Sequence, residues 1–287
     1  MKKIITTSII CLATYAATAQ TTKIFDAAGN HNLGLGYSGD GGLAVAAQLS
    51  NPLAITFDAA GNQYIADAGN ACVRMVNTAG IITTFAGNNA LGSGYAGDGS
   101  AATAAQLSNT ITALAFDGTG NLYIADAGNN RVRMVNTAGI ISTFAGGGTF
   151  GPASGNPATS ASFIGTITGL AFTTSHVKYS PNNEFGAAGA LFITTTSGVV
   201  SYLLYVKIST GILYMDGNSA TGSNMGDGGS VSSSSFNSLS GIAFDASGNL
   251  YIADAGNNRI RKVAYDSTST NGGIISNFAG NSAGTSG

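Results

Sequence analysis

The chain is built from an internal repeat. The hexapeptide Ile-Ala-Asp-Ala-Gly-Asn begins at Ile65, at Ile124 and at Ile252. The first two copies are 59 residues apart, and the third follows 128 residues later, about two periods. A degenerate copy between them places Ile193 at the same position of the repeat. A period of this length indicates that one supersecondary unit is copied along the chain, so the fold class depends on what one unit can form.

One unit has the pattern of four short strands. In the second unit the apolar or alternating runs are 112–116, 122–125, 132–135 and 140–144. Turns rich in Gly, Asn and Asp separate them, as expected between antiparallel strands. Four-stranded units repeated around an axis are the blades of a β-propeller. We therefore predict an all-β chain with four blades near residues 53–87, 112–146, 168–216 and 241–280, preceded by a strand and a long loop over 23–50.

A long segment links each fourth strand to the next first strand, and it has an order of its own. A Gly-Asp-Gly motif places aspartates at Asp40, Asp98 and Asp227, and the degenerate unit has Asn156 there. An alanine-rich piece follows and predicts one or two helical turns. Each piece ends at an apolar residue expected to anchor the segment, namely Leu49, Leu107, Phe163 and Phe236.

The segment from Ala115 to Arg133 resembles the NHL repeat, and 243–261 repeats it almost letter for letter. The Gly-Asp-Gly-Gly … Ala-Gln-Leu insertion is similar to the long-loop NHL variety of secreted bacterial proteins. The resemblance implies a β-propeller, commonly six-bladed in this family. It does not by itself imply a reaction, because the same architecture hosts binding modules and enzymes.

The strands do not add up to a closed ring. First, second and third strands are predicted four times, but fourth strands five times, the earliest near Ile24 and the last near Ile274. In a closed ring the strand near Ile24 would complete a final blade that lacks its own fourth strand. The final blade here has one. We therefore expect a C-terminally truncated piece of a five- or six-bladed ring, forming an open arc.

The first 19 residues have the order of a secretory signal peptide. Lys2 and Lys3 precede an apolar run, and Ala17-Thr18-Ala19 supplies the small residues read before cleavage. The mature chain would begin at Gln20 and be secreted, periplasmic or on the cell surface. Cys11 would leave with the signal, so Cys72 would be the single thiol, with no disulfide within the chain. We expect Cys72 to pack at the start of a strand rather than to react.

Charged residues make up 8% of the chain, against about 25% in an ordinary soluble domain. The net charge of −2 and the scarcity of basic residues argue against nucleic acid as a partner. Arginines fall on third strands, where we expect them to lie across neighbouring strands or to pair with turn aspartates: Arg74, Arg131, Arg133, Arg259 and Arg261. The 22 uncharged residues between Glu184 and Lys207 predict two strands and no membrane span.

Six aspartates form the candidate ligand-binding site. In a propeller, the loops that join fourth to first strands and second to third strands emerge on one face. That face would collect Asp40, Asp98, Asp227, Asp67, Asp126 and Asp254. Together they could attract a cation, a sugar or a basic surface of a partner. Alternatively, each aspartate only caps its own turn. No calcium-loop pattern is present, so the identity of any metal stays unknown.

The sequence names no catalytic residues. The NHL resemblance includes an amidating lyase whose zinc is held by histidines, but this chain has only His31 and His176, and catalytic zinc usually has three protein ligands. We predict a secreted binding or scaffold module for a protein or glycan partner, with no cofactor except that a divalent cation stays open. The alternatives are an extracellular lyase or lactonase whose metal is held by loop aspartates, and a purely structural or adhesive repeat. Oligomeric state is not predicted.

Overall fold

The chain folds into four antiparallel sheets of one design. The computed structural model describes residues 26–151, 153–174, 188–216, 226–264 and 273–280. The strands of the first sheet are β1 (Pro52–Phe57), β2 (Gln63–Asp67), β3 (Cys72–Val76) and β4 (Ile82–Ala86). Those of the second are β5 (Ile111–Phe116), β6 (Leu122–Asp126), β7 (Arg131–Val135) and β8 (Ile141–Gly146). Each sheet is an antiparallel meander in which consecutive strands pair.

The other two sheets repeat this order with small additions. The third contains β10 (Thr166–Thr173), β11 (Ala190–Ser197), β12 (Val200–Lys207) and β13 (Ile212–Met215), with the two-residue β9 (Asn156–Pro157) paired to its outer edge. The fourth contains β14 (Leu239–Phe244), β15 (Leu250–Asp254), β16 (Arg259–Ala264) and β17 (Ile274–Gly280). All helices in the described ranges are single 3-10 turns, so the predicted all-β class is confirmed.

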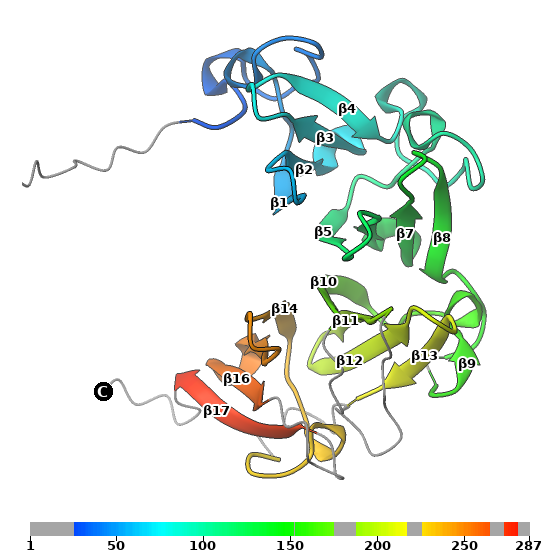
Figure 1. Cartoon of the computed structure of the whole chain (residues 1–287), viewed down its shortest axis with the longest axis vertical. Helices are drawn as coiled ribbons and strands as arrows, with labels where there is room; N and C mark the ends of the chain where they lie inside the picture. Colours follow the sequence, from blue (N-terminus) through cyan, green and yellow to red (C-terminus); the bar gives the residue numbers. More distant parts are fainter. Residues whose placement is uncertain (1–25, 152, 175–187, 217–225, 265–272, 281–287) are drawn as a thin grey trace, which may run out of the picture.

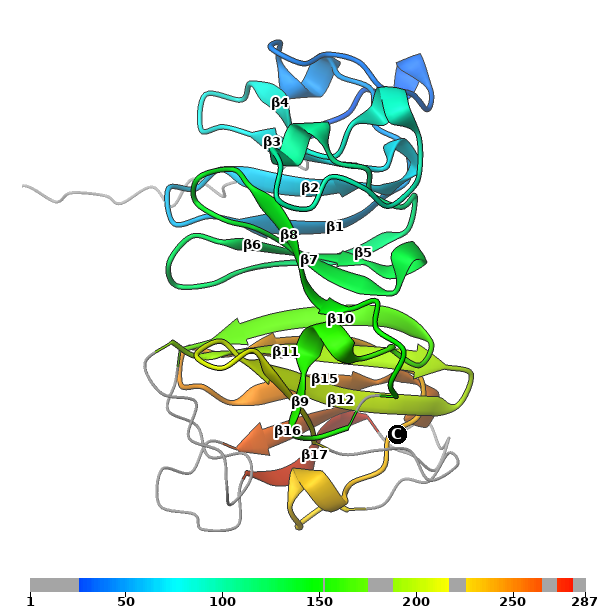
Figure 2. The same ribbon diagram turned by 90° about the vertical axis from the view of Figure 1, so that its right-hand side faces the viewer.

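The four sheets stand side by side along an open arc (Figure 1). The first strands β1, β5, β10 and β14 line its inner side, and β1 lies against β5, β5 against β10 and β10 against β14. The fourth strands β4, β8, β13 and β17 lie outside. Seen from the side, the sheets follow one another as successive layers (Figure 2). The first and fourth sheets form the two ends of the arc. Closure at five or six blades stays a prediction.

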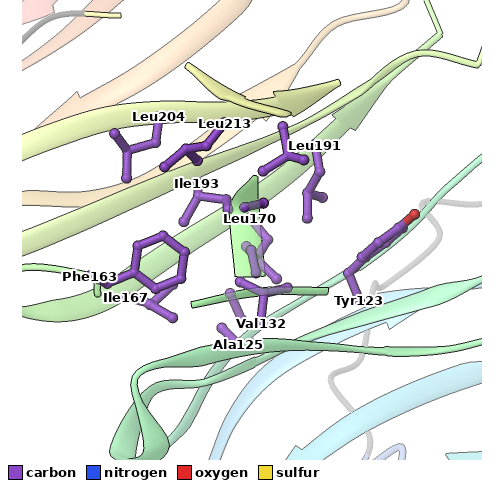
Figure 3. Packing of buried hydrophobic residues seen from close by; sticks show 14 of the residues in the cluster. Tyr123, Ala125, Val132, Phe163, Ile167, Leu170, Leu191, Ile193, Leu204 and Leu213 are labelled. Carbon is purple, nitrogen blue, oxygen red and sulfur yellow. The ribbon is translucent and has the colours of Figure 1, made fainter. Parts of the chain in front are cut away.

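Each sheet has two apolar faces that differ in character. We call leading the face that carries Ile124 in the second sheet, and trailing the face that carries Tyr123 and Ala125. Between the second and third sheets, the trailing side chains of Tyr123, Ala125 and Val132 pack against the leading side chains of Leu170, Ile193 and Leu204 (Figure 3). The small side chain of Ala125 on the trailing face leaves room for the branched leading residues, which is how cores interdigitate. The same pairing of faces fills the other two interfaces.

The long segments close the outer edges of the sheets. Isolated bridges join Leu43 to Ile81, Ala101 to Ile140 and Ser230 to Ile274, and β9 does the same for β13. Covering an edge strand in this way satisfies its backbone and blocks edge-to-edge association. The alanine-rich pieces form single 3-10 turns: η2 (Ala44–Ala46), η5 (Ala102–Ala104), η7 (Ala158–Ser160) and η8 (Val231–Ser233). The predicted anchors Leu107, Phe163 and Phe236 are buried, whereas Leu49 is half-buried.

The degenerate third unit keeps the fold of the others. Ile193 pairs with Leu170 as Ile124 pairs with Leu114, so its predicted position in the repeat is confirmed. The uncharged stretch before Lys207 forms β11 and β12, the two strands expected there. In the described part of the chain, no helix is long and apolar enough to span a membrane. The signal peptide, the strand near Ile24 and residues 175–187 of the third unit lie outside the described residues.

Two glycines of the second long segment allow a matched test of its packing. Gly97 and Gly99 both have a positive φ, at 91° and 81°. A Cβ at Gly97 would lie 2.7 Å from the Cα of Ala105, whereas a Cβ at Gly99 would meet nothing within 4 Å. We expect Gly99→Ala to cost about 1–2 kcal/mol of backbone strain and Gly97→Ala about 1–3 kcal/mol more. Urea unfolding measures both, and equal losses would contradict the close contact.

Candidate functional site

A fully buried arginine stands at the centre of three of the four units. Arg74 on β3, Arg133 on β7 and Arg261 on β16 are 0% exposed. Each lies beside an aspartate of the preceding long segment. A buried guanidinium is stable only when carboxylates and carbonyls satisfy it. The sequence predicted that these arginines pair with aspartates, and the ion pairs confirm it.

In the first unit, Arg74 joins the two predicted aspartates. Its Nη2 lies 2.6 Å from Oδ1 of Asp40, and its Nη1 lies 3.5 Å from Oδ2 of Asp67. The same guanidinium donates to the carbonyl oxygens of Ser38 and Gln48, at 3.1 and 3.4 Å. The long segment is thus attached to the middle of the sheet through one side chain.

The second and fourth units repeat this arrangement with one variation. Arg133 lies 2.6 Å from Asp98 and 3.6 Å from Asp126. In the fourth unit two arginines together bind the two aspartates. Arg261 is 2.7 Å from Asp227, and Arg259 is 3.0 Å from Asp227 and 3.2 Å from Asp254. The structure therefore brings the six predicted aspartates together as three pairs, each within one unit and each around arginine.

The aspartates at the ends of the second strands do not cap their own 3-10 turns. The turns are η3 (Ala68–Asn70), η6 (Ala127–Asn129) and η9 (Ala255–Asn257), and none has a side-chain cap. Asp67 instead accepts the backbone N–H of Ser50 at 2.6 Å and the side chain of Asn70 at 2.8 Å. The expected cap on the backbone of the turn is therefore not formed, and the carboxylate instead joins the side chain of Asn70 in its own turn to the incoming long segment at Ser50. Burial raises the pKa of Asp67 above its ordinary value.

The long-segment aspartates have a second set of partners that the sequence analysis missed. Oδ2 of Asp98 accepts the hydroxyls of Tyr95 at 2.8 Å and Thr143 at 2.7 Å. Partial burial pushes the pKa of Asp98 upward, but hydrogen bonds from Thr143 and Tyr95 and the charge of Arg133 outweigh it and lower the pKa. Asp40 has the same partners in Tyr37 and Thr84. The signal was available, since both residue types recur with the period of the repeat.

The third unit has lost all three members of this network. The strand register places Leu204 where Arg133 stands and Thr195 where Asp126 stands. Gly155 donates to Leu213 as Gly99 donates to Ile141, so Ser154 occupies the position of Asp98 and the predicted equivalence of Asn156 is wrong. Leu204 and Thr195 are both buried. A single buried charge without its countercharge is strongly destabilising. Loss of all three charged residues together avoids leaving such a charge in the sheet.

The other predicted features fall outside any cluster. Cys72 is buried, and burial raises the pKa of its thiol to about 12, so the expected packing role is confirmed. His31 lies exposed in η1 (His31–Leu33), and His176 is outside the described residues. No three His, Cys, Asp or Glu side chains in the described ranges gather in a group that could hold a metal.

A hollow lies between the first two long segments. Its volume is about 580 Å³, and its lining combines one aromatic ring with hydroxyl, amide and carboxylate groups: Tyr37, Asp40, Thr84, Asn88, Asn89 and Thr103. Tyr37 also lies over the guanidinium of Arg74, at 4.8 Å from ring centroid to Cζ. The wall of the hollow is therefore fixed by the buried arginine.

Two family models match parts of the sequence. The model of the teneurin NHL domain matches residues 9–96, and that of the NHL repeat matches residues 236–263. The chain therefore contains NHL-type repeats in these two segments. The second match spans β14, β15 and most of β16, the strands that carry Asp254, Arg259 and Arg261. No curated protein matches this sequence.

Solved structures resemble the NHL-repeat arc in fold. An auxiliary nutrient binding protein from Bacteroides thetaiotaomicron is 14% identical over 76% of this chain and 48% of its own, with a TM-score of 0.51. A chain of the nidogen/laminin complex is 14% identical over 77% of this chain and 62% of its own, with a TM-score of 0.49. Virginiamycin B lyase from Staphylococcus aureus is 17% identical over 79% of this chain and 55% of its own, with a TM-score of 0.43. This chain thus spans about half the length of the nutrient binding protein and the lyase.

Proposed function

We propose that this NHL-repeat protein is an exported binding or scaffold module that engages a protein or glycan partner through its long segments. Most of its exposed large apolar side chains lie on these segments. Leu35 is 80% exposed, and Leu33 and Leu91 recur at equivalent positions of the first two segments. Exposed apolar groups that cluster on loops mark interaction surfaces in soluble proteins. This clustering carries the proposal.

The buried arginines make such a surface rigid. Arg74 and Arg133 attach the first two segments to their sheets, and Tyr37 and Tyr95 lie over these guanidinium groups. A recognition loop that is held in place before binding loses less entropy when a partner docks. The aspartates then act as positioning groups for the loops.

The hollow beside Tyr37 supplies polar recognition next to the apolar residues. Carboxylate, amide and hydroxyl groups that converge with an aromatic ring suit hydroxyl-rich or peptide ligands. Asp40 contributes negative charge there, because hydrogen bonds from Thr84 and Arg74 lower its pKa despite partial burial. A neutral or basic partner fits this wall better than an acidic one.

Glycan and protein arrays test the proposal directly. We expect the wild-type chain to bind a defined subset, and we expect the double variant Leu35→Ser with Leu91→Ser to lose that binding while keeping its unfolding transition. Val199→Ser is the matched control, because Val199 is 51% exposed but lies in the turn between β11 and β12. Binding that survives the double variant overturns the role of the long segments. Blank arrays favour a purely structural repeat.

Calorimetry with divalent cations addresses the enzymatic alternative. A stoichiometric site for Ca²⁺, Mg²⁺ or Zn²⁺ that Asp98→Asn removes would favour a lyase or lactonase with a metal at the loop aspartates. We expect no such site, because Asp98 and Asp126 are engaged by Arg133. Circular dichroism of the variant shows whether a loss reflects the site or the fold.

Export is a separate part of the proposal. We infer cleavage after Ala19 from the basic start, the apolar run and the small residues of the first segment. Mass spectrometry of the exported protein should find Gln20 as its first residue. Recovery of the chain only in the cytoplasm, with the first segment intact, contradicts export.

A further inference from the structure

A second hollow lies where the first sheet meets the second, at the opposite end of the strands from the arginine networks. Its volume is about 400 Å³, within the range of about 300–1,000 Å³ that is usual for small-ligand pockets. The first sheet and its turn contribute Asp58, Tyr64 and Phe85 to the wall, and the second contributes Phe116 and Asn136. Both walls belong to neighbouring sheets, so the hollow is complete within residues 58–139.

Three aromatic rings line this hollow next to one another. The ring of Tyr64 meets that of Phe85 edge to face, with centroids 4.9 Å apart, and meets that of Phe116 in the same way at 4.8 Å. Tyr64 is buried, whereas Phe85 and Phe116 are half-buried, so the core does not cover these two rings completely. A cation is attracted to an aromatic face within about 6 Å of the ring centroid. Because the three centroids lie so close together, one cation in the hollow can interact with more than one ring.

Asp58 adds a negative charge beside the rings. Its Oδ1 accepts the backbone N–H groups of Ala60 and Asn62, both at 2.9 Å. Its Oδ2 accepts the side-chain amide of Asn62 at 2.8 Å and the hydroxyl of Tyr64 at 3.2 Å. Desolvation pushes the pKa of Asp58 upward, but these hydrogen bonds, chiefly those from Asn62, outweigh it and lower the pKa. The carboxylate is therefore ionised at neutral pH.

No basic side chain of the described residues forms an ion pair with Asp58. In the first two units, Arg74 and Arg133 bind the aspartates of their own networks. Asp58 is also the one charged side chain among the described residues that line the hollow. An ionised carboxylate that stands beside aromatic rings without a countercharge favours a cation from outside the chain.

We propose that this hollow binds a quaternary ammonium group. The two oxygens of Asp58 already accept four hydrogen bonds, which is about the capacity of a carboxylate. A primary ammonium or a guanidinium group would have to displace Asn62 or Tyr64 in order to donate its own hydrogen bonds. A quaternary ammonium group has no N–H, so it needs only the negative charge and the aromatic contact that the hollow offers. The site is separate from the long segments, which lie at the other end of the strands.

The second unit provides a matched control. Asp117 accepts the backbone N–H groups of Thr119 and Asn121, both at 2.9 Å, and the hydroxyl of Tyr123 at 3.2 Å, so its turn repeats that of Asp58. However, Asp117 and Tyr123 are only 9% and 1% exposed, and neither lines the hollow. Asp117→Asn therefore disturbs the same kind of turn as Asp58→Asn without touching the proposed site.

NMR titration of the whole chain with choline tests the proposal. We expect the N-methyl signal of choline to move upfield, because ring faces shield it, with a Kd on the order of 1 mM. Asp58→Asn should weaken binding about tenfold and Phe85→Leu about two- to fivefold. Asp117→Asn should bind choline like the wild type. The neutral analogue of choline that carries a tert-butyl group in place of trimethylammonium should bind about tenfold more weakly.

The source of the ammonium group is distinguished with vesicles. Choline binding without cosedimentation of the protein with phosphatidylcholine vesicles indicates a free cation. Cosedimentation with phosphatidylcholine but not with phosphatidylglycerol vesicles, lost in Asp58→Asn, indicates a lipid headgroup.

Four results overturn the proposal. The first is binding neither to choline up to about 20 mM, well above a millimolar Kd, nor to the phosphatidylcholine vesicles. The second is equal affinity for choline and its neutral analogue, and the third is equal affinity for methylammonium and tetramethylammonium. The fourth is unchanged choline binding by Asp58→Asn. Circular dichroism confirms that each variant is folded, and the two ligand comparisons need only the wild-type chain.

Discussion

Replacing Arg133 with leucine should destabilise the protein by about 3–5 kcal/mol, because it leaves Asp126 buried without its countercharge and Asp98 without its ion-pair partner. The free energy of unfolding from urea titration measures the loss. It should be largest near neutral pH, where both carboxylates are ionised in the unfolded chain.

The third unit supplies the control for this experiment. The triple variant Arg133→Leu, Asp98→Ser, Asp126→Thr gives the second unit the residues that the third unit already has. We expect it to recover most of the stability lost by Arg133→Leu alone, because no buried charge is left unpaired. A triple variant as unstable as the single one would show that the arginine acts through packing and not through charge.

Replacing Asp216 with alanine should stabilise the protein at pH 8 by up to about 4 kcal/mol. Asp216 is 2% exposed, and its Oδ2 has no hydrogen-bond partner among the described residues. Its backbone N–H bonds to Leu203, at the register where the other sheets hold Ala86 and Ala145. Burial raises the pKa of Asp216 to about 7.

The pH dependence of that effect has a definite sign. Between about pH 4 and pH 7 the unfolded chain releases the proton of Asp216 while the folded protein keeps it, so this group lowers stability as the pH rises. Its penalty is absent below pH 4 and complete above pH 7. Urea unfolding of wild type and Asp216→Ala at pH 5 and pH 8 should give a larger difference at pH 8. A difference that is the same at both values contradicts the buried-charge account, and Asp216→Asn separates charge from polarity.

The fold was predictable because one period of the repeat contains the pattern of all four strands of a sheet. The strand runs around Phe116 and Ile124 recur with the Gly-Asp-Gly and alanine-rich pieces, so the four blades follow from the repeat. The partners of the aspartates did not follow. Whether Asp67 caps its own turn or bonds Ser50 depends on where a segment 17 residues away lies, and local spacing does not encode that. Asp216 was missed because its sequence context marks a strand end, and only packing shows that it is buried.

Each arginine network is contained in one stretch of the chain. In the first unit it runs from Asp40 through Asp67 to Arg74, together with the segment that covers the outer edge of the same sheet. A duplication that copies one period therefore copies a complete set of charges and its own edge cover. Blade number can change in evolution without leaving half a network behind, and a blade that loses its charges, as the third has, does not disturb its neighbours.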